Sequence, residues 1–215
     1  MPDARAAILD RIRASLSADP SAPPAPPADY AAIPRSYIRA GRLTPEARLD
    51  LFLDRLRDYD THVVETNADS LRQTIAVILQ EHNQKKVIAA DSLPPELLPR
   101  DFAFIPEHAV GLDDLNACDG VVTVCAVAIA FTGSIVLTHG PGEGARRLTL
   151  VPDRHLCVVR AEQVVETVPE AFDRLLPHAT HPLTFISGPS ATADIEMTRI
   201  RGVHGPRFLD VVLVR

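Results

Sequence analysis

Residues 121–131, VVTVCAVAIAF, form the longest apolar run in the chain and decide its fold class. The run is far shorter than the roughly twenty apolar residues that span a bilayer, so it predicts a buried strand and no membrane span. A second segment rich in Val and Ile, residues 134–138, follows almost at once. Near-continuous hydrophobicity is typical of strands in a sheet covered on both faces. We therefore expect strands over residues 121–125 and 134–138 at the centre of such a sheet.

Two helices precede this centre. Thr44 with Pro45 and Glu46 is a helix-start signal, and Ser70 with Gln73 forms a capping-box pattern. Apolar residues at helical spacing predict the buried faces of these helices. The two faces are Leu49, Phe52, Leu53 and Leu56 in the first helix, and Leu71, Ile75, Ile78 and Leu79 in the second.

The remaining elements continue the alternation of helices and strands. We expect a short helix over residues 111–117 and a long one over 162–176. The inward residues of the long helix would be Val165, Val168, Phe172 and Leu175. Further strands are predicted at residues 62–65, 87–90, 155–159, 183–187 and 208–214. This order predicts an α/β protein with helices on both faces of its sheet.

The N-terminal region is predicted to be separate from the main domain, residues 36–215. Residues 1–16 form a short amphipathic helix, in which Ile8, Leu9, Ile12 and Leu16 share one face. Residues 17–35 are rich in proline, with five prolines between Pro20 and Pro27, and predict an extended tether. The helix could dock on its own domain or on a partner, and the sequence leaves both open.

Composition excludes several classes of function. The 215 residues carry a formal charge of -6, only 5% aromatic residues and no Trp, which argues against a nucleic-acid or anionic membrane surface. Three widely spaced cysteines, Cys118, Cys125 and Cys157, predict neither a disulfide framework nor a metal site on this chain. The N-terminus mixes acidic and basic residues, unlike a secretory signal. We therefore expect a cytoplasmic protein.

Three loops are candidates for ligand binding, because ligands of open α/β sheets bind outside the carboxyl ends of the strands. The first loop is a glycine turn, for which a purely structural kink is the alternative. The second offers backbone N–H groups and two guanidinium groups to an anion, and a solvated turn is the alternative. It matches neither the Walker nor the dinucleotide-binding pattern. The residues are Thr132, Gly133 and Ser134 in the first loop, and Gly140, Gly142, Gly144, Arg146 and Arg147 in the second.

The third loop follows the strand at 183–187 and holds many polar groups and turns. A triad of Ser190, His204 and Asp194 is disfavoured because no G-x-S-x-G elbow is present, and capping of turns is the main alternative. We expect the three loops to converge at one rim of the sheet and form one pocket. The candidate ligand-binding residues of this third loop are Gly188, Pro189, Ser190, Thr192, Asp194 and His204.

Two blocks, residues 128–159 and 186–214, resemble the lactate utilisation protein C family, which is built on the LUD domain. The most specific piece is GPS-x-T-x-DIE followed by GVHGP. The resemblance implies a three-layer α/β/α fold similar to ribose-phosphate isomerases and CoA-transferases. It also implies a part in bacterial L-lactate oxidation to pyruvate, together with partner proteins that carry iron-sulfur clusters. No catalytic residue is assigned to this component.

Two positions depart from the family pattern. Phe131 stands where many relatives carry an acidic residue, so a carboxylate role there is in doubt. Ala191 replaces a frequent arginine, which leaves Arg146 and Arg147 to hold an anion.

Three functions are consistent with these observations. The leading hypothesis is a non-redox accessory or regulatory subunit of a lactate-oxidising system, with no cofactor of its own, binding iron-sulfur partners and an anionic small molecule. The alternative is a free-standing enzyme or binding protein for a phosphorylated or CoA-linked small acid, although fold analogy is a poor guide to reaction. The third is a purely structural adaptor.

Overall fold

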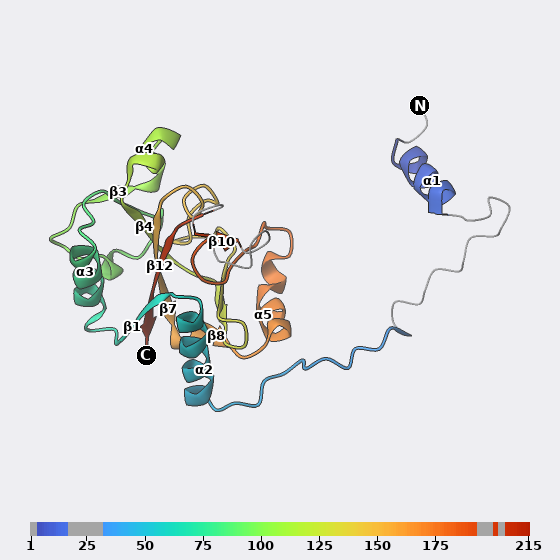
Figure 1. Ribbon diagram of the computed structural model, residues 1–215, viewed down its shortest axis with the longest axis horizontal. Helices are drawn as coiled ribbons and strands as arrows, with labels where there is room; N and C mark the ends of the chain where they lie inside the picture. The colour runs from blue at the N-terminus through green and yellow to red at the C-terminus, as the bar shows by residue number, and fades with distance from the viewer. Residues whose placement is uncertain (1–3, 17–31, 193–199, 202–204) are drawn as a thin grey trace. The chain divides into compact units, whose positions relative to one another are not determined.

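The computed structural model describes residues 4–16, 32–192, 200–201 and 205–215 (Figure 1). The chain divides into two units, Met1–Tyr37 and Ile38–Arg215. In the first unit α1 (Ala4–Leu16) is helical as predicted, and none of its residues is buried. Ile8, Ile12 and Leu16 of its expected apolar face are exposed.

The second unit is built on a six-stranded parallel sheet, whose strand order is β1-β12-β7-β4-β2-β3. The centre of the sheet therefore consists of strands distant in sequence. The strands are β1 (His62–Thr66), β2 (Val87–Ala89), β3 (Phe104–Pro106), β4 (Gly120–Val124), β7 (Arg154–Arg160) and β12 (Phe208–Val214).

Alternate residues of β7 and β12 pack on opposite faces of this sheet. Cys157 and Val211 belong to the hydrophobic cluster that includes the buried face of α2 (Pro45–Asp58), whereas Val158 and Val212 belong to the cluster of α3 (Leu71–Glu81). Both helices bury the residues predicted from their spacing, so those two predictions are confirmed. The smaller α4 (Leu112–Ala117) also forms as predicted and buries Leu115.

The two helix starts differ. The Thr44 side chain accepts a hydrogen bond from the Ala47 backbone N–H at 3.2 Å, as its sequence predicts. The prediction of a capping box at Ser70 is wrong, because Ser70 itself has helical backbone angles and its side chain makes no capping hydrogen bond. Instead the Asn67 side chain accepts a hydrogen bond from the Ser70 N–H at 2.9 Å.

A second, four-stranded mixed sheet packs on the α2 face of the large one, and its order is β8-β5-β6-β9. One face of it joins the α2 core through Ala128, Ile135 and Leu137, and the other is covered by α5 (Val168–Leu175). Figure 1 shows α3 and α5 on opposite sides of the unit. The strands are β5 (Val127–Ile129), β6 (Ser134–Leu137), β8 (Val164–Val165) and β9 (Thr184–Ile186).

This second sheet corrects three expectations. The strand predicted over residues 121–125 forms as β4 at the centre of the large sheet, but the apolar run 121–131 is not one strand, because its second half forms β5 in the small sheet. Residues 134–138 contribute β6 to the small sheet rather than a strand to the central one. The long helix over 162–176 is wrong, because Val164 and Val165 pair with β5 and α5 begins only after the Thr167 cap. Of the residues expected to face inward, Val165 and Leu175 are buried, whereas Phe172 is exposed.

The architecture is α/β with both faces of the main sheet covered, as predicted, although a small sheet as well as α2 covers one of them. β10 (Ala191–Thr192) and β11 (Ile200–Arg201) form a two-stranded antiparallel ribbon. The short 3-10 turns are η2 (Pro95–Leu97), η3 (Glu107–Ala109), η4 (Ala161–Gln163) and η5 (Leu176–His178).

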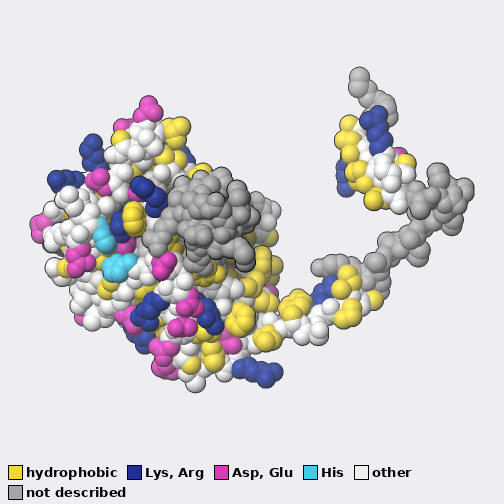
Figure 2. Space-filling model, viewed as in Figure 1, with side chains coloured by type: hydrophobic (Ala, Val, Ile, Leu, Met, Phe, Trp, Pro, Cys, Tyr) yellow, Lys and Arg dark blue, Asp and Glu magenta, His cyan; other side chains and the backbone are white. Residues whose placement is uncertain are grey.

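No helix among the described residues has the length and apolar content needed to cross a bilayer. On the face shown in Figure 2, basic and acidic side chains are interspersed over the described surface.

Candidate functional site

A cavity of about 260 Å³ lies beside β9, and we call it the β9 cavity. Its inner wall is His155 and Leu209, the second residues of β7 and β12. The cavity therefore lies at the amino ends of these two strands, not at the carboxyl ends where the sequence places a ligand. Other lining residues are Arg146, Thr149, Ser187, Gly188, Pro189 and Ser190.

A second cavity, of about 510 Å³, is the Gly140 cavity. It lies near the carboxyl ends of β2 and β4, because Gly142 donates its N–H to Asp91 O and accepts from Val124 N, both at 2.9 Å. Its lining includes Asp91, Glu107, His139, Gly140, Gly144 and Arg146.

Arg146 belongs to both cavities, whereas Arg147 lines neither. Both arginines are exposed. The Arg146 guanidinium lies 3.4 Å from the Thr149 hydroxyl, on the side of the β9 cavity. Arg147 instead lies near Asp91. The pKa of Asp91 is lowered mainly by the hydrogen bond from His108, and the positive charge of Arg147 lowers it further. Only one of the two predicted cations can therefore serve the β9 cavity directly.

His155 is the buried titratable group in the wall of the β9 cavity, and the sequence analysis missed it. It is 1% exposed, and its Nε2 lies 2.8 Å from the Thr123 hydroxyl. Burial lowers the pKa of His155 from 6.5 to about 4, and the Asp210 carboxylate opposes this only in part. The ring is thus neutral at pH 7. A histidine inside an apolar strand is the sequence signal that could have identified it.

The first predicted loop is linked by hydrogen bonds between hydroxyl groups to Ser187, which lines the β9 cavity. Thr132 donates to Ser134 at 2.8 Å, and the Ser134 and Ser187 oxygens lie 2.7 Å apart. Gly133 forms the turn at a φ of 60°, with the Arg55 backbone at its back. Phe131, the departure from the family pattern, is exposed on this turn. Thr132 and Gly133 therefore support the cavity without lining it.

The backbone at position 188 can accommodate only glycine. Its φ is 81°, and a Cβ atom there would lie 2.5 Å from Tyr59 Cβ. The turn continues through Pro189 to Ser190, whose N–H donates to Pro206 O at 2.8 Å. Thr192 belongs to β10, and Asp194 and His204 lie outside the described residues.

The described residues of the three loops therefore do not line one common pocket. The Gly188 to Ser190 turn and Ser187 line the β9 cavity, while Gly140 and Gly144 line the Gly140 cavity at the other end of the strands. Gly142 lines neither cavity and holds its loop against β2 and β4. His139 connects the two, because its ring bonds Gly144 O and the Thr184 hydroxyl, each at 2.8 Å.

Two buried carboxylates, Glu107 in the lining of the Gly140 cavity and Glu143 within its loop, are hydrogen-bonded rather than free to act as a base. Glu107 accepts from Ala145 N at 2.9 Å and from Asp91 N at 3.3 Å. Glu143 accepts hydrogen bonds from the backbone and hydroxyl of Thr138. Both carboxylates hold the loop and are thereby committed to backbone donors.

The cysteines are free thiols. The pKa of Cys125 is raised well above its usual value, first by a hydrogen bond with Cys157 and then by burial. The pKa of Cys118 is raised by its partial burial. Since the thiolate is the reactive form, neither thiol is activated as a nucleophile.

Comparison with known proteins identifies the family. The profile of the LUD domain matches residues 112–214. Lactate utilization protein C of Deinococcus radiodurans is 40% identical over 169 residues, which cover 77% of this chain and 79% of that protein. The protein YkgG of Escherichia coli is 26% identical over 93% of this chain and 91% of its own length.

A solved structure agrees. The crystal structure of a DUF162 family protein from Deinococcus radiodurans superposes with a TM-score of 0.71 at 34% identity, over 81% of this chain and 100% of that chain. The predicted resemblance is confirmed. The chain belongs to the LUD-domain family of lactate utilization protein C and YkgG.

Proposed function

We propose that this protein is an accessory or regulatory subunit of a bacterial L-lactate-oxidising system in the cytoplasm. The observation that carries the proposal is the 40% identity, along most of the chain, to a protein named for lactate utilization. In this proposal the chain works with partner proteins that hold iron-sulfur clusters.

The number of cysteines supports the placement of the iron-sulfur clusters on partner proteins. A cluster held by cysteines takes four thiolates, and the sequence has three, two of which are buried in the core. We propose that electron transfer belongs to the partners and that this chain senses or positions a small anionic molecule.

The β9 cavity supports the ligand part of the proposal. It combines the Arg146 guanidinium with the Thr149 and Ser187 hydroxyls, which are donors suited to a carboxylate. The neutral His155 adds no charge there. A volume of about 260 Å³ suits a small organic acid better than a CoA ester.

Two experiments test the role in lactate oxidation. Tagged protein, purified from its native host, should bring down iron-sulfur proteins encoded nearby, and deletion of its gene should slow growth on L-lactate. An Arg146→Ala strain should grow slowly as well if the cavity matters, whereas an Arg147→Ala strain serves as the matched control. Absence of co-purifying partners together with normal growth of the deletion strain would refute the proposal.

The second candidate is an enzyme or binding protein for a phosphorylated or CoA-linked acid. The larger Gly140 cavity favours it, because Arg146 and the glycine backbone of its loop suit an anion. A thermal-shift screen with sugar phosphates, nucleotides and CoA esters tests this idea. Stabilisation of the wild type that is lost in Arg146→Ala and kept in Arg147→Ala would support it, and a blank screen would remove it.

A further inference from the structure

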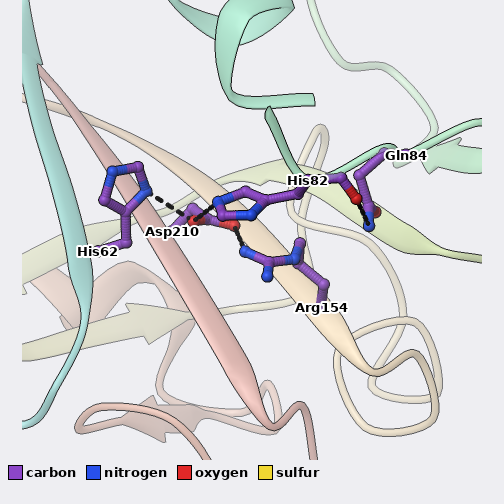
Figure 3. A network of polar contacts seen from close by, with 5 residues as sticks. All are labelled: His62, His82, Gln84, Arg154 and Asp210. Carbon is purple, nitrogen blue, oxygen red and sulfur yellow. Dashed lines mark hydrogen bonds and ion pairs between the residues drawn. The ribbon is translucent and has the colours of Figure 1, made fainter. Parts of the chain in front are cut away.

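A polar cluster on the α3 face of the sheet belongs to neither cavity. It consists of His62, His82 and Asp210, with Arg154 and Gln84 beside them (Figure 3). His62 is the first residue of β1 and lies directly opposite Asp210 in the parallel register with β12. His82 is the residue at which α3 ends. The fold thus brings together side chains that are 148 positions apart.

The cluster presents three ligand atoms at close range. His62 Nδ1 lies 2.9 Å and His82 Nε2 lies 3.6 Å from the same oxygen, Oδ1 of Asp210. The three atoms all lie within 4.8 Å of one another. In a tetrahedral zinc site, with ligand bonds of about 2.0–2.2 Å, neighbouring ligand atoms are roughly 3.3 Å apart. The two distances to Asp210 Oδ1, 2.9 and 3.6 Å, lie on either side of this spacing.

His82 supplies an independent observation. Its Nε2 atom is buried and has no hydrogen-bond partner among the described residues, and 3.6 Å is too long for a hydrogen bond to Asp210. A buried polar atom of this kind requires an explanation, and an ion between the imidazole and the carboxylate is one.

Arg154 orients the carboxylate. Its guanidinium donates to Oδ2 of Asp210 at 2.7 Å, so Oδ1 is the oxygen that faces the histidines. Asp210 is fully buried, whereas the His62 side chain is 44% exposed and that of His82 is 30% exposed. A fixed carboxylate and two imidazoles on partly exposed side chains supply three of the four ligands of a tetrahedral zinc site, and water would supply the fourth.

We propose that His62, His82 and Asp210 bind a divalent transition-metal ion of the zinc class. Imidazole nitrogen favours zinc, copper or nickel over magnesium or calcium. The guanidinium charge of Arg154 opposes the cation, so we expect weaker binding than at a site where the carboxylate is unpaired. This inference does not depend on the proposed function.

The test uses the full chain stripped with EDTA and dialysed against micromolar Zn²⁺, with bound metal measured by elemental analysis. The wild type should bind one zinc ion more than His62→Ala/His82→Ala. Both histidines are partly exposed, so the variant should keep its fold, which circular dichroism checks. Zn²⁺ should raise the Tm of the wild type by a few degrees and leave that of the variant unchanged.

The matched control is His178→Ala/His181→Ala. These two imidazoles also stand close, with ring centroids 5.4 Å apart, but they belong to no three-ligand group among the described residues. This variant should bind zinc like the wild type. With Co²⁺ in place of zinc, the wild type and the control should show visible d–d absorption that the His62/His82 variant lacks. Equal metal content and equal spectra in all three proteins would overturn the proposal.

Discussion

The two faces of the sheet differ sharply at one point, the amino ends of β7 and β12. Arg154 and His155 are neighbours on β7, and Leu209 and Asp210 are neighbours on β12. Because side chains alternate along a strand, each pair is divided between the faces. His155 and Leu209 face the β9 cavity, whereas Arg154 and Asp210 form an ion pair on the α3 face.

The difference shows two ways in which a protein buries a titratable group. His155 has one hydroxyl partner and stays neutral, with its pKa lowered to about 4. Asp210 instead has a guanidinium at 2.7 Å and an imidazole at 2.9 Å. A neutral ring needs only a hydrogen bond, while a buried carboxylate needs a countercharge. The two faces should therefore respond differently to substitution and to pH.

The largest effect is expected on the α3 face, from Asp210→Asn. The substitution leaves the Arg154 guanidinium, only 13% exposed, without its countercharge. Loss of one partner of a buried pair costs roughly 3–5 kcal/mol of the free energy of unfolding. Urea denaturation followed by circular dichroism measures it.

Asp153→Asn is the control for this prediction. Asp153 precedes Arg154 in sequence and pairs with Arg207, but that pair is exposed. Its loss should leave the unfolding free energy almost unchanged. Equal effects of the two substitutions would mean that the Arg154 pair is no more important than a surface one.

On the cavity face the expected effect depends on pH. The pKa of His155 is about 4 in the folded chain, below its ordinary 6.5, so the unfolded chain binds a proton first as the pH falls. This stability is present above pH 6.5 and is lost as the pH falls toward 4. Between pH 7 and pH 5 the loss attributable to His155 is about 2 kcal/mol.

His155→Gln isolates the contribution of His155 to the pH dependence of stability, because the amide can keep the hydrogen bond to Thr123 without titrating. The wild type should lose about 2 kcal/mol more than the variant when urea denaturation is repeated at pH 7 and pH 5. Parallel curves for the two proteins would show that His155 is not buried as described.

The sequence predicts local features of this fold well. The buried faces of α2 and α3 follow from spacing within one helix, and β12 was predicted residue for residue. It predicts strand partners poorly. Nothing local separates β4 from β5 within one apolar run, and the strand at Val164 is specified only by its pairing with Ala128. The helix predicted over residues 162–176 was therefore wrong, because helical spacing was assigned to residues 164–165, which form a strand.

The candidate sites show the same limit. Gly188, Ser190 and Arg146 were identified from turn chemistry and charge, and they do line one cavity. His155 was passed over because a lone imidazole in an apolar strand carries no spacing pattern. His62 and Asp210 could not be associated either, because only the parallel pairing of β1 with β12 places them opposite each other.

The smallest effect is expected for the hydroxyl contact beside the β9 cavity. Ser134 is buried, and Ser187, its partner at 2.7 Å, is exposed. Ser187→Ala should cost about 0.5–1 kcal/mol of unfolding free energy, since Ser134 keeps the bond from Thr132. Ser134→Ala/Ser187→Ala should cost less than the sum of the single changes, because both partners leave together. Additive costs, measured by urea denaturation, would show that the two hydroxyls do not interact, and the cavity face would then owe its order to packing alone.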